Sequence, residues 1–362
     1  MLLAREDLAP VDAVRRLVGL QAQEPASPYI ALWNRLLGFE ADHLDAAFRD
    51  FELVKASLMR ITLHAVAAED RGAFHAAMSS TLRAARLHDD RFRSTGLTIA
   101  DADAIVSQLL AFSDRPRNRK AIEAMLAERL GTPLKPGVWW ALRSTAPLVH
   151  APQEEPWSFG RAPSFMAAPD ADATHDRAEA IQRLIVRYLE AFGPASRRDV
   201  AQFALLKQSD LGPAFAALTD ELVPIDGPGG VALFDVPGAP LPDGDEPAPP
   251  RLLAMWDSVL LAYKDRGRVI PSAYRSHVIR RNGDVLPTVL VDGYVAGVWR
   301  HVDGAVEVTA FEALDDDAWD GIEDEARSLL RFVNERDDAV YGRFGHWWSR
   351  LPDGQVRVVR PG

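Results

Sequence analysis

The chain has 362 residues, of which 48% are hydrophobic and 26% charged, and its formal net charge is −11. This composition is typical of globular proteins and excludes long-range disorder. The absence of cysteine excludes disulfides, Cys-ligated zinc, iron–sulfur clusters and thiol nucleophiles. No apolar run approaches the length of a membrane span, and acids stand where a signal peptide would be basic and apolar. We therefore expect a soluble cytoplasmic protein.

The negative charge is concentrated in one segment. Residues 302–340 contain thirteen acids and three arginines, a net charge of −10, which leaves −1 for the rest of the chain. Residues 251–300 contain eight lysines and arginines against four aspartates. A negative net charge disfavours nucleic-acid binding, but this distribution leaves room for a basic surface.

Three stretches share the order helix, short turn, helix and two short strands, which is the winged-helix pattern. The fold class is therefore α+β, with three tandem winged-helix units that we expect to form a C-shaped scaffold. The predicted boundaries are 1–80, 81–170 and 171–236 for the three units, 237–250 for a proline-rich linker, and 251–362 for a β-rich region with an acidic helix.

The first unit is predicted to contain helices at Val11–Leu20, Pro28–Leu37 and His43–Phe51, then a hairpin of Leu53–Met59 and Ile61–Val66. The second contains helices at Asn118–Arg129 and Pro136–Arg143, with wing strands at 148–149 and 164–166. The third contains a helix at Ala173–Phe192, a helix capped by Ser196, a helix at Pro213–Leu222, and wing strands at 223–225 and 231–234.

After the linker the pattern is mostly β. Strands are predicted at 285–291, 294–299 and 306–309, joined by hairpin turns at Asp292-Gly293 and Asp303-Gly304. An acidic helix follows at Asp316–Arg331. The familiar phosphate-binding, dinucleotide-binding, zinc-protease and serine-hydrolase motifs are absent, and the nine histidines lack ligand spacing. We therefore predict no metal and no organic cofactor.

The segment Gly19-Leu20-Gln21-Ala22-Gln23-Glu24-Pro25 carries the main chemical signal. Pro25 disfavours helix at Glu24, so the helix from Val11 is expected to end near this segment. On extended or irregular backbone, amides at positions i and i+2 point the same way. Alone, the pattern is also typical of amides that cap the C-terminus of a helix.

Three segments together resemble one bacterial family: residues 19–23, Met59-Arg60-Ile61-Thr62-Leu63-His64-Ala65-Val66, and residues 285–300, VLPTVLVDGYVAGVWR. The chain resembles the winged-helix DNA glycosylases of the AlkZ and YcaQ type, which remove N7-alkylated purines and unhook interstrand crosslinks. The resemblance covers nearly the whole chain. Gln21 and Gln23 match the Q-x-Q motif of the AlkZ branch, whereas the YcaQ branch has an acid at the second position.

A glutamine amide cannot act as a general base at neutral pH, but it can accept a hydrogen bond from a water and position it. An N7-alkylguanine is already cationic, so its departure needs no protonation. The resemblance and this chemistry together predict a monofunctional DNA glycosylase in which Gln21 and Gln23 are the catalytic residues.

Duplex DNA carrying alkylated purines is the expected partner of a monomeric protein that binds no membrane. Arg60 and His64, on the hairpin, are expected to contact a phosphate or the lesion, although His64 is equally typical of a polar residue closing a strand. Phosphate contacts supply affinity without sequence specificity. The further DNA-binding candidates are Arg143, Arg161, Lys264, Arg266, Arg268, Arg280, Arg281 and Arg300.

The resemblance also implies a β-hairpin that probes the lesion, and two segments are candidates: the turn at Asp292-Gly293, and the wing at 152–163 with Trp157. The alternative function is a non-catalytic winged-helix DNA-binding regulator, in which Arg197, Arg198 and Gln202 would read bases. An inactive family member is a third hypothesis. Burial of Gln21 and Gln23 against the core would count against catalysis.

Overall fold

Three antiparallel sheets organise the computed structural model, which describes residues 1–361. A six-stranded sheet has the order β1-β3-β2-β5-β6-β4, a five-stranded sheet has the order β13-β12-β11-β10-β9, and β7 pairs with β8. The strands are β1 (Leu20–Gln21), β2 (Leu53–Ser57), β3 (Leu63–Ala67), β4 (Arg117–Asn118), β5 (Leu148–Ala151), β6 (Ser164–Ala167), β7 (Val223–Asp226), β8 (Ala232–Asp235), β9 (Arg251–Leu252), β10 (Thr288–Val291), β11 (Tyr294–Val302), β12 (Ala305–Ala310) and β13 (Gln355–Val359).

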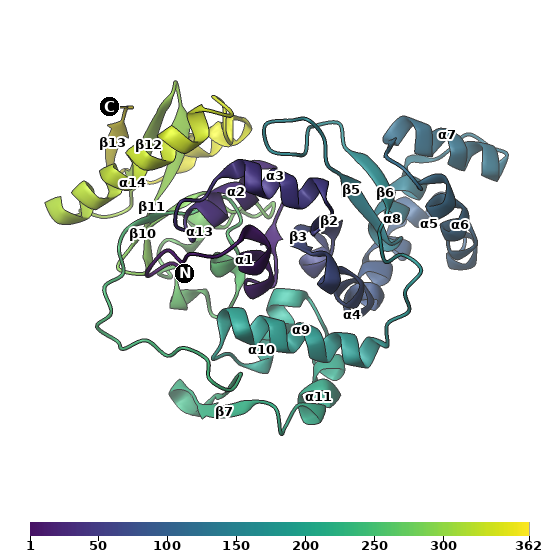
Figure 1. The fold of residues 1–362 in the computed structure, drawn as a ribbon, viewed down its shortest axis with the longest axis horizontal. Helices are drawn as coiled ribbons and strands as arrows, with labels where there is room; N and C mark the ends of the chain where they lie inside the picture. The colour runs from purple at the N-terminus through teal and green to yellow at the C-terminus, as the bar shows by residue number, and fades with distance from the viewer. Residues whose placement is uncertain (362) are drawn as a thin grey trace.

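Helices cover these sheets, so the predicted α+β fold class is confirmed (Figure 1). The α-helices are α1 (Pro10–Arg16), α2 (Ala26–Trp33), α3 (Ala41–Arg49), α4 (Ala68–Leu87), α5 (Asp90–Arg93), α6 (Ile99–Phe112), α7 (Arg119–Leu130), α8 (Pro136–Thr145), α9 (Arg177–Phe192), α10 (Arg197–Ala204), α11 (Gln208–Ala217), α12 (Ser258–Leu261), α13 (Arg275–Val278) and α14 (Asp316–Asn334). Short 3₁₀ segments are η1 (Met59–Ile61), η2 (Pro228–Gly230), η3 (Arg266–Arg268) and η4 (Gly342–Arg350). In the described part of the chain, none of the helices combines the length and apolarity that crossing a bilayer requires.

The β2–β3 hairpin, predicted at Leu53–Met59 and Ile61–Val66, lies at the centre of the molecule (Figure 1). Successive residues of β3 face two different cores. Ala65 packs with Leu20 in the core that contains α2 and α3, whereas Val66 packs with Val54 in the core that contains α4 and α9. This part of the sheet is thus buried on both faces, which explains its small and β-branched residues.

The hairpins of the first two predicted units belong to one sheet. Strand β2 pairs with β5 through Lys55 and His150, and β5 continues to β6. The third hairpin, β7 with β8, stays separate and closes against the start of α10 through the bridge between Ala195 and Phe234. The order of helices followed by a hairpin therefore recurs three times along the chain.

Several local predictions are confirmed. Ser196 begins α10 with a capping box, in which its hydroxyl accepts from the Asp199 amide and the Asp199 carboxylate accepts from the Ser196 amide. Both Asp-Gly hairpin turns have two successive positive φ angles, 49° and 77° at Asp292-Gly293 and 50° and 72° at Asp303-Gly304. The acidic helix is α14, with its apolar side buried.

Other elements differ from the predictions. Helix α1 ends at Arg16 rather than Leu20, because Val18 has a φ of 65° and the chain then enters β1. Helices α4 and α6 were not predicted. Helix α4 lies between the sheet and α9 and is buried continuously from Asp70 to Phe74, so no single apolar stripe marks it in the sequence.

Candidate active site

Gln21 lies on β1, directly opposite His64 of β3. The close approach of these strands depends on Gly19, where a β-carbon would lie 2.7 Å from Val66 Cγ1 and 3.0 Å from the Ala65 carbonyl oxygen. The carbonyl of Gly19 also accepts a hydrogen bond from Ser258 Oγ at 3.1 Å. The short strand that carries Gln21 is thus fixed from both sides, on extended backbone as predicted.

Arg60 occupies the turn between β2 and β3. Arg60 and Ile61 have φ angles of 52° and 60°, and the amide of Thr62 donates to the Met59 carbonyl at 3.1 Å. Turns with two left-handed residues favour Asn and Gly, and a β-branched residue there is strained. The unfavourable backbone conformation sets the direction in which the Arg60 side chain leaves the hairpin.

The guanidinium of Arg60 joins three elements. Its Nη2 lies 3.0 Å from Gln21 Oε1 and 3.1 Å from His64 Nε2. Its Nη1 donates to the Phe203 carbonyl, at the end of α10, at 2.8 Å, and the guanidinium carbon lies 4.9 Å from the centre of the Phe203 ring. The structure therefore brings together Gln21, Arg60 and His64, as the sequence predicted, and adds Phe203.

The protonation of His64 follows from its surroundings. Its side chain is fully buried, and this desolvation, together with the charge of Arg60, lowers its pKa to about 3. A neutral ring that carries its proton on Nδ1 donates to the Thr62 carbonyl at 3.1 Å and leaves Nε2 to accept from Arg60. His64 is therefore neutral at pH 7 and orients Arg60 rather than adding charge.

Gln21 is only 4% exposed, but its surroundings are polar. Its Oε1 has two lone pairs, of which Arg60 uses one, so the amide oxygen can still accept a hydrogen bond from one water. Gln21 is shielded from bulk solvent, but the charged side chain of Arg60 is among its neighbours. Gln21 is buried, which was expected to count against catalysis, but its amide oxygen keeps one free lone pair for a water.

Gln23 lies at the edge of the cluster and is exposed. Its Oε1 accepts a hydrogen bond from the backbone amide of Leu63, the first residue of β3, at 2.9 Å. The two amides therefore have different partners: a charged side chain for Gln21 and a strand end for Gln23.

The segment 263–268 contacts α10, the helix whose Phe203 carbonyl accepts from Arg60. The Lys264 amide donates to Asp199 Oδ1 at 2.8 Å, and Tyr263 Oη donates to the Phe192 carbonyl at 3.1 Å. Arg266 is close enough to lower the pKa of Arg60, which burial and this repulsion bring to about 9. Among residues 1–361, the structure shows no ion pair for Lys264, Arg266 or Arg268.

The remaining predicted DNA-binding residues lie in other surroundings. Arg280 stacks over the Trp347 ring at 5.0 Å, and Arg281 is exposed. Arg300 forms a bidentate pair with Glu307 across β11 and β12, so its charge is already compensated. Arg143 is exposed on α8 in the second unit.

The wing at 152–163 is folded against the protein. Trp157 is buried, and its Nε1 donates to Asp337 at 2.9 Å, so this ring does not project as a probe of DNA. Arg161, on the same wing, is exposed and lies near Glu24. The Asp292-Gly293 turn remains the other candidate hairpin.

Two charged residues beside the motif were missed by the sequence analysis. Lys55 is 4% exposed on β2, opposite Ala65, and therefore faces away from Gln21. Burial lowers its pKa to about 8, whereas Glu24 opposes that shift. Glu24 itself pairs with Arg343. The sequence signal that could have identified Lys55 is a lysine within the otherwise apolar run of a predicted strand.

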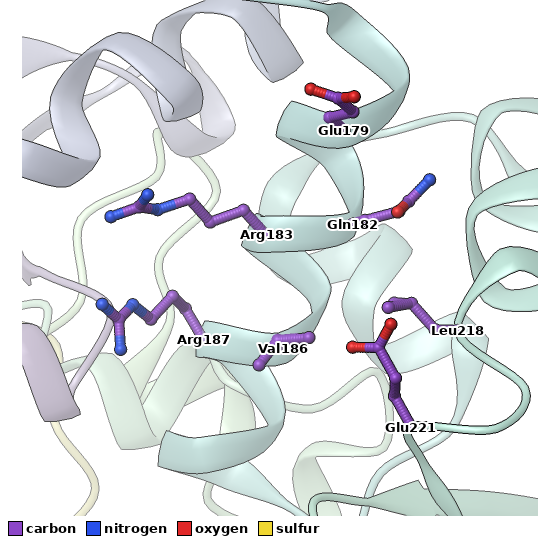
Figure 2. Close-up of a pocket in the computed structure, with 7 residues that line it drawn as sticks. All are labelled: Glu179, Gln182, Arg183, Val186, Arg187, Leu218 and Glu221. Atoms are coloured by element: carbon purple, nitrogen blue, oxygen red, sulfur yellow. The ribbon is translucent and has the colours of Figure 1, made fainter.

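A hollow of about 370 Å³ lies elsewhere, on the outer side of α9 (Figure 2). Arg183 and Arg187 point to one side of the helix, whereas Glu221 and Leu218 lie on the other. Both arginines pair with Asp70 of α4. The hollow shares no residue with the Gln21 cluster, and its cations are already compensated.

The chain is similar over most of its length to DNA glycosylases. The chain belongs to the AlkZ-like DNA glycosylase family, whose sequence model matches residues 14–332. An interstrand DNA cross-link repair glycosylase of Streptomyces sahachiroi is 26% identical over 339 residues, which cover 88% of this chain and 90% of that protein. The solved structure of the DNA glycosylase AlkZ from the same organism superposes with a TM-score of 0.78, at 24% identity, over 91% of this chain and 92% of that one.

Proposed function

We propose that this glycosylase is monofunctional and hydrolyses the N-glycosidic bond of N7-alkylated purines in duplex DNA, with crosslinks or bulky adducts among its substrates. The observation that carries the proposal is the hydrogen bond between Arg60 Nη2 and Gln21 Oε1. It holds an amide, rather than a carboxylate, as the group that would accept a hydrogen bond from the attacking water. The crosslink repair activity named for the Streptomyces sahachiroi relative supports the same substrate class.

The chemistry suits a leaving group that is already cationic. As the C1′–N9 bond breaks, its electron pair neutralises the positive charge of the alkylated ring, so no acid is needed. Gln21, and Gln23 beside it, would hold the water that attacks C1′, and orientation of this kind is a large source of catalysis. Unmodified purines and uracil lack the cationic leaving group and should remain uncleaved.

DNA binding would use the three helix-and-hairpin units as winged helices on a C-shaped scaffold. The segment that carries Lys264, Arg266 and Arg268 lies beside the Gln21 cluster and offers charge to phosphates. Among residues 1–361 these three cations form no ion pair, so they would offer uncompensated charge to DNA. The overall negative charge therefore does not prevent local binding to DNA.

The test is base release from a duplex with a single 7-methylguanine, compared between the native protein and the Gln21→Ala/Gln23→Ala variant at equal DNA occupancy. We expect release by the native protein and at least a hundredfold slower release by the variant. Gln182→Ala, which truncates an amide on the outer side of α9, should release base at the native rate.

Two results would contradict the proposal. Release that survives in the double variant would remove the catalytic role of the amides. An absence of release despite salt-sensitive duplex binding, also with a crosslinked duplex, would favour a DNA-binding regulator or an inactive family member. In the regulator, exposed Arg197 and Arg198 at the start of α10 would be the first residues to mutate.

A further inference from the structure

The charge around Gln21 is positive. Arg60 bonds to Gln21, Arg266 lies near Arg60, and His64 is held neutral by burial. Among residues 1–361, neither arginine is part of an ion pair. The cluster therefore contains two cations and no carboxylate in contact with them.

The nearest acids are committed elsewhere. Asp199 acts on Arg266 from a distance, but its Oδ2 accepts from the amide and hydroxyl of Ser196, and its Oδ1 accepts from the Lys264 amide. Glu24 pairs with Arg343, near Lys55 on the face of the sheet opposite to Gln21. Neither carboxylate compensates Arg60.

This arrangement conflicts with the reaction unless the substrate adds negative charge. Departure of the purine leaves positive charge on C1′ and the ring oxygen of the deoxyribose, and like charges repel strongly in a site of low dielectric constant. A carboxylate would normally stabilise such a transition state. Here, two guanidinium groups would oppose it.

We propose that Arg60 binds one phosphate diester of the lesion strand, and that this phosphate provides the negative charge that stabilises the cationic deoxyribose. The inference rests on the proposed glycosylase function and deepens it. In the balanced reaction, the C1′–N9 electron pair leaves with the base, the water oxygen bonds to C1′, and the proton released by that water passes to the solvent.

The geometry of Arg60 fits this role. A guanidinium has five N–H groups, and the bonds to Gln21, His64 and the Phe203 carbonyl occupy three of them. The remaining N–H groups, one on Nε and one on Nη1, can each donate to a phosphate oxygen. The side chain is partly exposed, so a phosphate can reach it.

The strained turn supports the same role. Two successive left-handed residues, Arg60 and Ile61, occupy positions that glycine or asparagine would fill at lower cost. Strain of this kind is found where a side chain must be held in one direction. Here it holds the guanidinium between Gln21 and α10, so that one phosphate would be placed at a fixed distance from the catalytic amide.

The test replaces single phosphates near the lesion by neutral methylphosphonates. Each duplex contains one 7-methylguanine and one methylphosphonate, placed in turn at each of the two nearest phosphates on either side of the lesion. Base release is measured under single-turnover conditions, with enough excess enzyme to bind all of the duplex. We expect one position to slow release at least tenfold, although the duplex remains fully bound. The fully charged duplex is the reference.

The variant Arg60→Ala links this effect to the protein. It should be slow on the fully charged duplex and should lose no further rate at the sensitive methylphosphonate, because the interaction is already absent. Arg60→Lys, which keeps the charge, should recover part of the rate and part of the methylphosphonate effect. Arg83→Ala, which breaks the surface pair between Arg83 of α4 and Asp103 of α6, should retain the full methylphosphonate effect.

If every methylphosphonate duplex reacts within threefold of the reference, or if Arg60→Ala loses rate at the sensitive position as much as the native protein does, the inference is wrong. If the fully charged duplex releases no base with the native protein, the proposed function itself fails. If Arg60→Ala does not fold, Arg60→Lys and the phosphate scan of the native protein still decide between these outcomes.

Discussion

Arg60 Nη2 lies 3.0 Å from Gln21 Oε1, although the two residues are 39 positions apart in the sequence. This hydrogen bond fixes the orientation of the amide, because Arg60 can only donate and must therefore face the oxygen of Gln21. The Nε2 of Gln21 is then directed away from the guanidinium. One long-range contact thus sets the orientation of the Gln21 amide.

Gly19→Ala should disturb this arrangement from the backbone. The added methyl group would lie 2.7 Å from Val66 Cγ1 and 3.0 Å from the Ala65 carbonyl, so β1 must move away from β3. We expect a loss of about 1–3 kcal/mol of unfolding free energy, measured in urea, and slower base release. Gly345→Ala in η4, where an added β-carbon has no other atom within 4 Å outside its chain neighbours, should instead gain up to about 1 kcal/mol. Equal stabilities for the two variants would contradict this assignment.

Asp257→Asn should strongly destabilise the protein. Asp257 and Arg35 form a bidentate pair at 2.7 and 2.8 Å, with side chains 0% and 2% exposed. Neutralising one partner leaves a buried charge uncompensated, which costs about 3–5 kcal/mol. Arg83→Ala, at an exposed pair, should cost less than about 1 kcal/mol. Urea denaturation of both variants measures the difference, and a similar loss in each would exclude a special role for the buried pair.

Lys55→Met should alter how stability depends on pH. The buried Lys55 has a pKa of about 8, below its ordinary value of 10.5. Between these values the unfolded chain binds a proton that the folded protein has lost, so native stability should rise with pH, by about 3 kcal/mol in total. Below pH 8 the variant should be more stable than the native protein, and the gap should close by pH 10.5. Lys120→Met, at an exposed site, should show a constant difference over this range.

Binding to duplex DNA should weaken steeply with salt, because cations near the site release counterions from phosphates. Replacing both Arg266 and Arg268 by alanine should reduce the slope of log affinity against log salt by about 1–2. Arg83→Ala should leave the slope unchanged, since Asp103 already compensates that charge. A native slope near zero, measured by fluorescence anisotropy from 50 to 300 mM NaCl, would remove this surface as the DNA contact.

The parts of the fold that were predicted correctly depend on local signals. Ser196 and Asp199 lie three residues apart and form one cap, and Asp292-Gly293 alone defines its turn. The two strands of the β2–β3 hairpin are neighbours in the sequence, separated only by a short turn. Such features need no knowledge of distant parts of the chain, which explains why short segments of the sequence were sufficient.

The parts that were missed depend on packing between distant segments. The partner of Arg60 on α10 is a backbone carbonyl 143 positions away, and a carbonyl carries no sequence signature. Burial of Gln21 follows from the register between β1 and β3, which Gly19 permits. The wing at 152–163 looked free in the sequence, but Trp157 bonds to Asp337 near the end of α14.

The exposed linker at 237–250 joins two parts that are also held together elsewhere. Tyr188 Oη donates to the Ala262 carbonyl, Lys264 contacts Asp199, and Arg35 pairs with Asp257, so each side of the linker contributes to the cores of the other. A protease that cuts only this linker should therefore yield two fragments that stay associated on a sizing column. The same property makes the linker a natural place to divide the gene, with two separately encoded chains assembling into one glycosylase.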